Sequence, residues 1–176
     1  DLINFFGDDY KDKRCLEIGT HKGHTTRVLS NLFKEVITCE MSAKLIDFAK
    51  NLNKDKNNIK FLQKDVYDTD WDFKDIDVIF IDCNHEYSHV VTDIKNAISL
   101  CKINQELLII FDDYGLTNPW KGVKEAVDEF IEKEPRFNLV KFIGEQKGSD
   151  CNPRANLKDE EGVICKYTNK SLQRFL

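Results

Sequence analysis

The chain has 176 residues, with 26 Lys and Arg against 31 Asp and Glu and a formal net charge of −5. This length suits one domain with a buried core, so we expect a single domain over residues 1–176. The apolar runs are far shorter than the ~20 residues that cross a bilayer, which excludes a membrane protein of that kind. The net negative charge disfavours a broad nucleic-acid surface. The chain begins at Asp1 without a methionine, which leaves open the removal of an N-terminal piece.

The cysteine pattern favours neither a disulfide framework nor a zinc site. Six cysteines stand at 15, 39, 83, 101, 151 and 165, and no two of them form a Cys-x-x-Cys pair. Several fall in predicted strands, where a thiol behaves as a small buried apolar group. We therefore expect reduced thiols and a cytoplasmic protein.

Strand-like and helical segments alternate along most of the chain. We predict strands at 14–18, 36–40, 59–63, 77–82 and 106–111, and helices at 24–33, 43–53, 87–101 and 120–134. This alternation indicates crossover connections and a mostly parallel sheet. Two further strand-like runs, 137–143 and 162–167, have no helix between them, which suggests an antiparallel pair. The polar segment that joins them, Glu145 to Glu161, is either a flap over the site or a plain disordered connection.

The first strand runs into a glycine turn and then directly into a helix. Gly19 and Gly23 lie in this turn, and the next predicted strand ends on the carboxylate of Glu40. This pattern is typical of a βαβ unit that binds an adenosine-containing cofactor. The middle glycine of a dinucleotide fingerprint is missing, and Glu17 and His21 suit a positively charged cofactor better than a pyrophosphate.

An acid follows each predicted parallel strand, at the edge where doubly wound sheets bind ligands. After the fourth and fifth strands stand Asp82, Asp112 and Asp113, which adjacent strands would bring close together. Clustered like charges repel unless a cation or protons neutralise them, and oxygen-only ligation favours Mg²⁺, Ca²⁺ or Mn²⁺. The alternative is that these acids cap the following turns and are merely hydrated.

The glycine turn resembles motif I of class I S-adenosylmethionine-dependent methyltransferases. The segments Val78–Tyr87, Ile109–Gly115 and Gly122–Asp128 are similar to methyltransferase family 24, which is related to macrocin-type and catechol-type O-methyltransferases. The likeness extends from about Arg14 to Phe130. It implies an α/β, Rossmann-like class I methyltransferase fold. In that fold a seven-stranded, mostly parallel sheet has the order 3-2-1-4-5-7-6, with strand 7 antiparallel and helices on both faces.

The resemblance also implies the roles of individual residues. Glu40 would bind the ribose, Asp65 would accept a hydrogen bond from the adenine amino group, and Val66 would offer its backbone N–H to the ring. The full set expected to bind S-adenosylmethionine is Glu17, Gly19, Thr20, His21, Gly23, Thr25, Glu40, Met41, Asp65, Val66 and Asp82. Mg²⁺ or a similar divalent cation would be held by Asp82, Asp112 and Asp113.

The segment after the fourth strand departs from the family pattern. Family members commonly have Asp-Gly-Asp-His there, whereas this chain has Asp82-Cys83-Asn84-His85. The change puts the identity of the general base in doubt. His85 is the first candidate because its near-neutral pKa suits proton abstraction from a hydroxyl. It could equally cap the helix or support the metal acids, and Asp82 is the candidate base if no metal binds.

The favoured function is O-methylation of a small-molecule hydroxyl, sugar-like or catechol-like, by an S-adenosylmethionine-dependent enzyme. A nucleic-acid methyltransferase is disfavoured by the lack of an Asn/Asp-Pro-Pro-Tyr/Phe element after the fourth strand and by the net charge. The sequence is also compatible with a non-catalytic cofactor-binding protein or an NAD-dependent oxidoreductase. No membrane partner is indicated, and the oligomeric state, a homodimer included, stays open.

Overall fold

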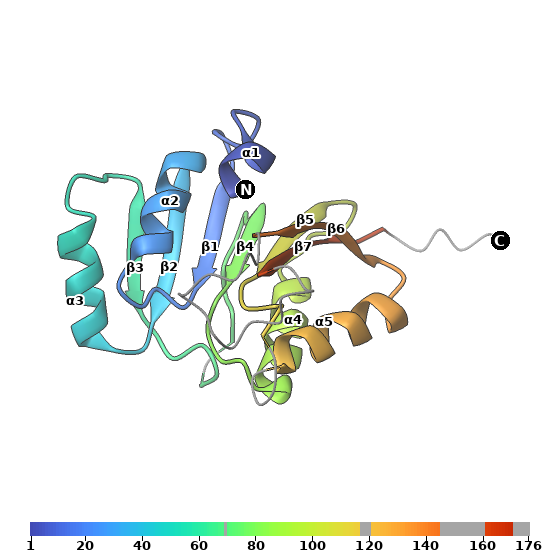
Figure 1. Ribbon diagram of the computed structural model, residues 1–176. Coiled ribbons are helices and arrows are strands. Elements are labelled where there is room, and N and C mark those ends of the chain that lie inside the picture. The colour runs from blue at the N-terminus through green and yellow to red at the C-terminus, as the bar shows by residue number, and fades with distance from the viewer. Residues whose placement is uncertain (69, 117–120, 145–160, 171–176) are drawn as a thin grey trace.

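A computed structural model describes residues 1–68, 70–116, 121–144 and 161–170. These residues form a seven-stranded sheet in the order β3-β2-β1-β4-β5-β7-β6 (Figure 1). The strands are β1 (Arg14–Ile18), β2 (Glu35–Glu40), β3 (Ile59–Gln63), β4 (Val78–Ile81), β5 (Glu106–Phe111), β6 (Phe137–Ile143) and β7 (Gly162–Thr168). Neighbours from β3 to β5 are parallel, and β7 is antiparallel to both β5 and β6. The predicted fold class and strand order are confirmed.

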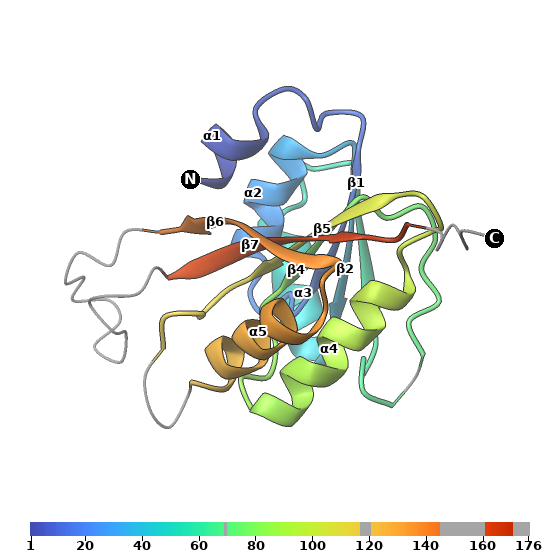
Figure 2. The same ribbon diagram turned by 90° about the vertical axis from the view of Figure 1, so that its right-hand side faces the viewer.

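Helices cover both faces of the sheet (Figure 2). The helices are α1 (Leu2–Phe6), α2 (His24–Leu32), α3 (Ala43–Leu52), α4 (Tyr87–Ser99) and α5 (Gly122–Lys133). One apolar cluster joins α1 and α2 to one face of the sheet, and another joins α4 and α5 to the opposite face. Only α1 was not predicted, because five residues are too few to show a helical period.

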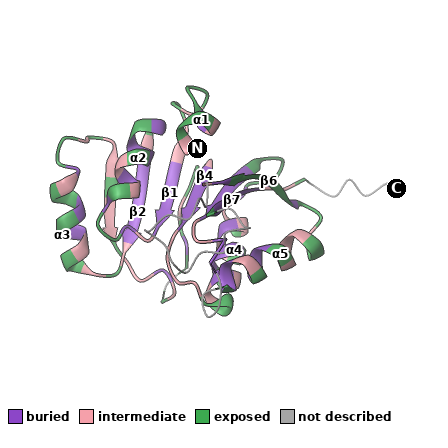
Figure 3. Ribbon diagram, in the orientation of Figure 1, coloured by how far each residue is buried: buried purple, intermediate pink, exposed green. Residues whose placement is uncertain are grey.

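Successive side chains of a strand point to opposite faces of the sheet, so neighbouring residues belong to different apolar clusters. Leu16 and Ile18 of β1 belong to the cluster under α4, whereas Cys15 belongs to the cluster under α2. The central strands are buried along their length, while the outer surfaces of α3 and α5 are exposed (Figure 3). Such strands, covered on both faces, read as nearly continuous apolar runs.

The parallel register places the carboxyl ends of five strands along one edge of the sheet. Ile18 of β1 pairs with Cys39 of β2 and with Ile81 of β4, and Ile81 pairs with Phe111 of β5. The segments that follow these residues therefore meet at that edge, as predicted.

Two other expectations concern cysteines and membranes. The five cysteines in the described ranges are free thiols, and Cys151 lies outside those ranges. Among the described residues, none of the helices combines the length and the apolar character that a membrane span needs. The connection predicted over 145–161 lies, except for Glu161, outside the described residues.

Candidate functional site

A cavity of about 300 Å³ lies at the carboxyl ends of β1, β2, β3 and β4. Its walls include most of the residues that the sequence nominated for cofactor binding, namely Gly19, His21, Glu40, Met41, Asp65, Val66 and Asp82. Its other lining residues, which sequence reasoning missed, are Cys39, Lys64, Tyr67 and Cys83. Each of these four is the immediate neighbour of a nominated residue, so adjacency was the available signal.

The turn after β1 approaches the end of β4 so closely that only glycine fits. Gly19 has a φ of +98°, and a Cβ built on it would lie 1.8 Å from the carbonyl oxygen of Asp82. The backbone N–H groups of Gly19 and Thr20 both donate to the carbonyl oxygen of Cys39, at 3.1 Å. The turn is thus fastened to β2 on one side and packed against β4 on the other.

Glu40 is held at the cavity by backbone amides. Its Oε2 accepts a hydrogen bond from the N–H of His21 at 3.0 Å, and its Oε1 accepts one from the N–H of Ser42 at 2.9 Å. Each carboxylate oxygen retains a further lone pair, because an ionised carboxylate has about four acceptor positions. The carboxylate is therefore fixed in direction while it keeps acceptor capacity for hydroxyl groups.

Glu17 lies beneath the turn and does not line the cavity. The side chain is fully buried, and one oxygen accepts hydrogen bonds from the hydroxyls of Thr26 at 2.6 Å and Thr38 at 2.5 Å. Its Oε1 has no hydrogen-bond partner among the described residues. Burial raises the pKa of Glu17 to about 8, although the two threonine hydrogen bonds act in the opposite direction.

Three other residues expected to bind the cofactor, Thr20, Gly23 and Thr25, are not among the lining residues of the cavity. Thr20 shares a 2.5 Å hydroxyl contact with Thr38, and Gly23, with a φ of +79°, is the N-cap of α2. Thr20 and Gly23 therefore shape the turn from within, whereas Thr25 is a half-buried residue of the first turn of α2. The expectation that they bind the cofactor stays a prediction.

The loop after β3 closes the far end of the cavity. The Oδ1 of Asp65 accepts a hydrogen bond from the N–H of Tyr67 at 3.0 Å, and the carbonyl of Val66 accepts one from the indole N–H of Trp71 at 3.1 Å. The Tyr67 hydroxyl donates to Asp93 of α4 at 3.0 Å. The loop is therefore anchored at three successive residues.

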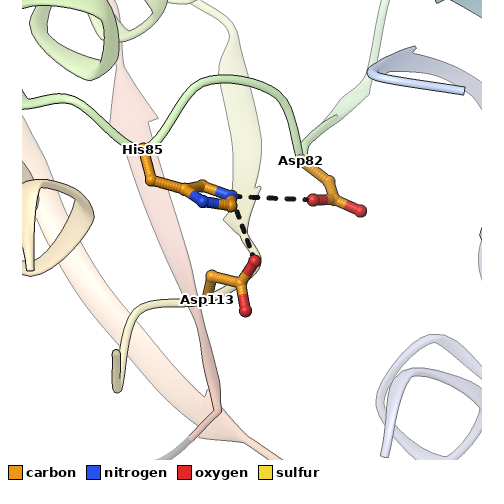
Figure 4. A group of neighbouring side chains, drawn as sticks. All are labelled: Asp82, His85 and Asp113. Carbon is orange, nitrogen blue, oxygen red and sulfur yellow. Dashed lines mark ion pairs between the residues drawn. The ribbon is translucent and has the colours of Figure 1, made fainter. Parts of the chain in front are cut away.

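An acidic cluster adjoins the cavity, and Asp82 belongs to both. Figure 4 shows Asp82, His85 and Asp113 pointing toward one another. The Nε2 of His85 lies 3.0 Å from Oδ2 of Asp113 and 3.9 Å from Oδ1 of Asp82. The two carboxylates, Asp113 first, raise the pKa of His85 to about 9 against the opposing effect of burial. A histidine cation thus partly balances the acids.

The structure changes one member of the predicted metal set. Ligand atoms of Asp82, His85 and Asp113 all lie within 4.8 Å of one another, and Asp112 is not part of this group. Asp112 is instead a half-buried group, and burial, followed by the charges of Asp82 and Asp113, raises its pKa to about 7. Carboxylate oxygens suit Mg²⁺ and Mn²⁺, whereas an imidazole suits transition ions, so exchanging Asp112 for His85 shifts the donor set toward divalent transition ions.

Tyr114 holds the loop that carries Asp113. Its hydroxyl donates to Oδ1 of Asp128 at 2.7 Å and accepts a hydrogen bond from the Lys124 ammonium at 2.8 Å. Asp113 has a φ of +57°, a left-handed conformation that directs it differently from its neighbour Asp112. This local geometry selects which of the two successive acids reaches His85.

Comparisons with known proteins agree with this arrangement. A family model described as a methyltransferase domain matches residues 16–114. None of the curated proteins matches the chain. Many solved structures do match.

Three solved structures illustrate the likeness. An O-methyltransferase from Bacillus cereus in complex with SAH has a TM-score of 0.67 and 21% identity, covering 95% of this chain and 77% of that one. Cofactor-bound Rv0187 from MTB has a TM-score of 0.72 and 16% identity, with coverages of 97% and 79%. The fibrillarin pre-rRNA processing protein of Methanococcus jannaschii has a TM-score of 0.63 and 17% identity, with coverages of 93% and 70%. At these identities the likeness establishes the fold alone.

Proposed function

This chain belongs to the family of S-adenosylmethionine-dependent methyltransferase domains, and from that premise we propose that it methylates a hydroxyl oxygen of a small molecule. One observation carries the proposal: Asp82 lines the cavity and is also a member of the acidic cluster. A methyl donor in the cavity and a hydroxyl acceptor at the cluster would therefore both lie next to Asp82. Methyl transfer in line needs this adjacency, because positioning supplies most of its rate.

The cavity residues supply binding and orientation of the donor. Glu40, fixed by two backbone amides, accepts hydrogen bonds from the ribose hydroxyls. Asp65 and Val66 face the adenine, and the acids along this edge favour the positive sulfonium over a phosphate-bearing cofactor. Because Gly19 has no side chain, the turn packs against the carbonyl of Asp82, and its backbone forms part of the wall that the donor would meet.

The acidic cluster supplies the acceptor side of the reaction. As a carbon–oxygen bond forms, the carbon–sulfur bond breaks, sulfur keeps the electron pair, and the hydroxyl proton passes to the carboxylate of Asp82, because a cationic His85 has no free lone pair to accept it. The residues fit a divalent cation, since Asp82 and Asp113 present converging oxygens. Such a cation, when bound, would lower the pKa of the acceptor hydroxyl. Such a cation would also disfavour the protonated form of His85, which lies beside both carboxylates and in its neutral form is the alternative acceptor of the proton.

Several features favour a small acceptor in the cytoplasm. The formal net charge is −5, whereas protein surfaces that bind nucleic acid are basic. One structurally similar protein is a pre-rRNA processing protein, so RNA belongs in any acceptor screen as the competing outcome. The free thiols of the described cysteines suit a reducing compartment.

Asp113→Asn tests the acceptor side directly. The variant keeps the shape of the side chain but loses the charge, so we expect unchanged affinity for S-adenosylhomocysteine. Methyl transfer to a panel of sugars and catechols should fall by about 100-fold, the scale of one lost acid–base or electrostatic contribution. Radiolabelled methyl transfer measures the rate, and calorimetry measures the affinity.

Asp75→Asn is the matched control for this experiment. Asp75 also has a left-handed φ, +58°, and an ion-pair partner, Lys102, but it does not belong to the cavity or the cluster. The Asp75→Asn variant should transfer methyl groups at the parent rate.

Two outcomes with the parent protein would contradict parts of the proposal. If its activity is undiminished in EDTA, a cation has no part in the mechanism. Transfer to RNA, but to none of the small hydroxyl compounds, would reject the proposed acceptor class.

A further inference from the structure

A buried carboxylate stands behind the wall of the donor cavity. Asp93 of α4 is 0% exposed, although it occupies the stripe of the helix that otherwise carries Val90, Ile94 and Ala97. The spacing of these residues is that of a core-facing helical surface, where an apolar side chain is expected. Burial of a carboxyl group in such a place costs free energy unless hydrogen bonds replace those it made to water.

Asp93 has one hydrogen-bond partner among the described residues, and that partner lines the cavity. Its Oδ2 accepts the hydroxyl hydrogen bond of Tyr67 at 3.0 Å, while its Oδ1 has no hydrogen-bond partner among the described residues. Burial raises the pKa of Asp93 to about 7, and the bond from Tyr67 lowers it in part. The group therefore accepts a desolvation penalty, while the one hydrogen bond that it makes among the described residues goes to a residue of the functional site.

Tyr67 is held from three directions. Its backbone N–H is bonded to Asp65, its hydroxyl to Asp93, and its ring meets the edge of the His89 ring at a centroid distance of 4.7 Å and an interplanar angle of 76°. An aromatic side chain fixed at both ends forms a rigid surface with few alternative rotamers. Tyr67 thus presents a preformed wall to whatever enters the cavity.

We infer that Asp93 is a positioning residue for the methyl donor: through the Tyr67 hydroxyl it fixes the cavity wall beside Val66 and so sets the affinity for the cofactor. The inference rests on the proposed function, since it concerns the same cavity. Asp93 itself is not among the lining residues and touches no reacting group. A preorganised wall increases affinity by lowering the ordering cost of binding.

Asp93→Leu separates positioning from stability. Leucine restores the apolar stripe and removes an incompletely bonded buried carboxyl, so the melting temperature should stay the same or rise. Affinity for S-adenosylhomocysteine should nevertheless fall by about tenfold, the scale of one lost hydrogen bond to a charged partner. The KM for the donor should rise while kcat at saturating donor changes little. Loss of a residue with only a structural role would instead lower the melting temperature and leave the affinity for the donor unchanged.

Two further single variants, one double variant and one control complete the design. Asp93→Asn keeps an acceptor oxygen for the Tyr67 hydroxyl, so it should retain affinity close to that of the parent. Tyr67→Phe removes the hydroxyl and should weaken binding as Asp93→Leu does, and the double variant should be no weaker than either single one. Tyr87→Phe is the matched control, because the Tyr87 hydroxyl bonds Glu129 on the exposed surface.

The outcomes distinguish this inference from the proposed function. A parent protein that binds S-adenosylhomocysteine, with Asp93→Leu and Tyr67→Phe at parent affinity, overturns the inference and leaves the function standing. A parent protein that does not bind S-adenosylhomocysteine overturns both. If Asp93→Leu fails to fold, Tyr67→Phe against Tyr87→Phe decides the question alone.

Discussion

The two halves of the site differ in what holds their acids in place. In the donor half, at the ends of β1, β2 and β3, backbone amides fix Glu40 and threonine hydroxyls fix Glu17. In the acceptor half, after β4 and β5, the acids Asp82 and Asp113 face the side chain of His85. Backbone contacts persist whatever binds, whereas an ion pair between side chains rearranges when a cation or substrate enters. The donor half is therefore preformed, whereas in the acceptor half the charges of the two acids are partly balanced by the His85 cation.

The largest effect is expected at the glycine that joins the two halves. Gly19→Ala places a methyl group on the carbonyl of Asp82 and imposes a strained positive φ, so we expect a loss of stability on the order of 4 kcal/mol. Cofactor binding should be lost with it. Gly7→Ala is the control, since Gly7 also has a positive φ but open space around it. Equal urea midpoints for the two variants would refute the close approach of the turn to β4.

The next effect concerns Glu17 and the pH dependence of stability. Burial raises its pKa from 4.5 to about 8, so between these values the folded chain binds a proton that the unfolded chain releases. Stability should therefore fall as pH rises from about 5 to 8, by on the order of 4 kcal/mol from this group. Below pH 4.5 and above pH 8 its contribution should be constant.

Urea denaturation of the parent and of Glu17→Gln at about pH 5 and about pH 9 isolates this group. The glutamine variant cannot ionise, so its stability should change less between the two pH values than that of the parent. Identical changes in the two proteins would show that Glu17 is not the buried, proton-binding support of the turn.

The smallest effect tests whether the carboxylate of Glu40 itself binds the donor in the donor half of the site. Glu40→Gln keeps one acceptor oxygen but loses the charge, so affinity for S-adenosylhomocysteine should fall by about tenfold. Glu35→Gln, at the opposite end of the same strand and paired with Arg14, should leave the affinity unchanged. Isothermal titration calorimetry gives both values. A weaker affinity in Glu35→Gln of the same size would show that β2, not the Glu40 carboxylate, governs binding.

The sheet and the edge that carries the site could be predicted from the sequence. Apolar runs that alternate with helical periods imply parallel strands, and parallel strands carry their ends to one edge. The ends of β2, β3 and β4 therefore identified Glu40, Asp65 and Asp82 as cavity residues. The strand order is confirmed because it depends on the order of the elements alone, whereas the cofactor-binding roles of these residues stay a prediction.

The direction of individual side chains could not be predicted in the same way. Glu17 was expected to bind cofactor, but it alternates with Leu16 and Ile18 and points to the opposite face of the sheet, beneath Thr26. Asp112 and Asp113 are adjacent in sequence, and only the left-handed φ of Asp113 determines which one meets His85. Such choices are made by local backbone geometry, which a pattern of residue types does not specify.

The central claim is that the cavity at the ends of β1 to β4 holds the methyl donor. Titration of the parent chain with S-adenosylhomocysteine, in EDTA and then in Mg²⁺, tests this claim most directly. We predict one molecule bound per chain with the same affinity in both solutions, because the residues that fix Glu40 lie outside the acidic cluster. Absence of binding, or binding of NADH in its place, would contradict the claim.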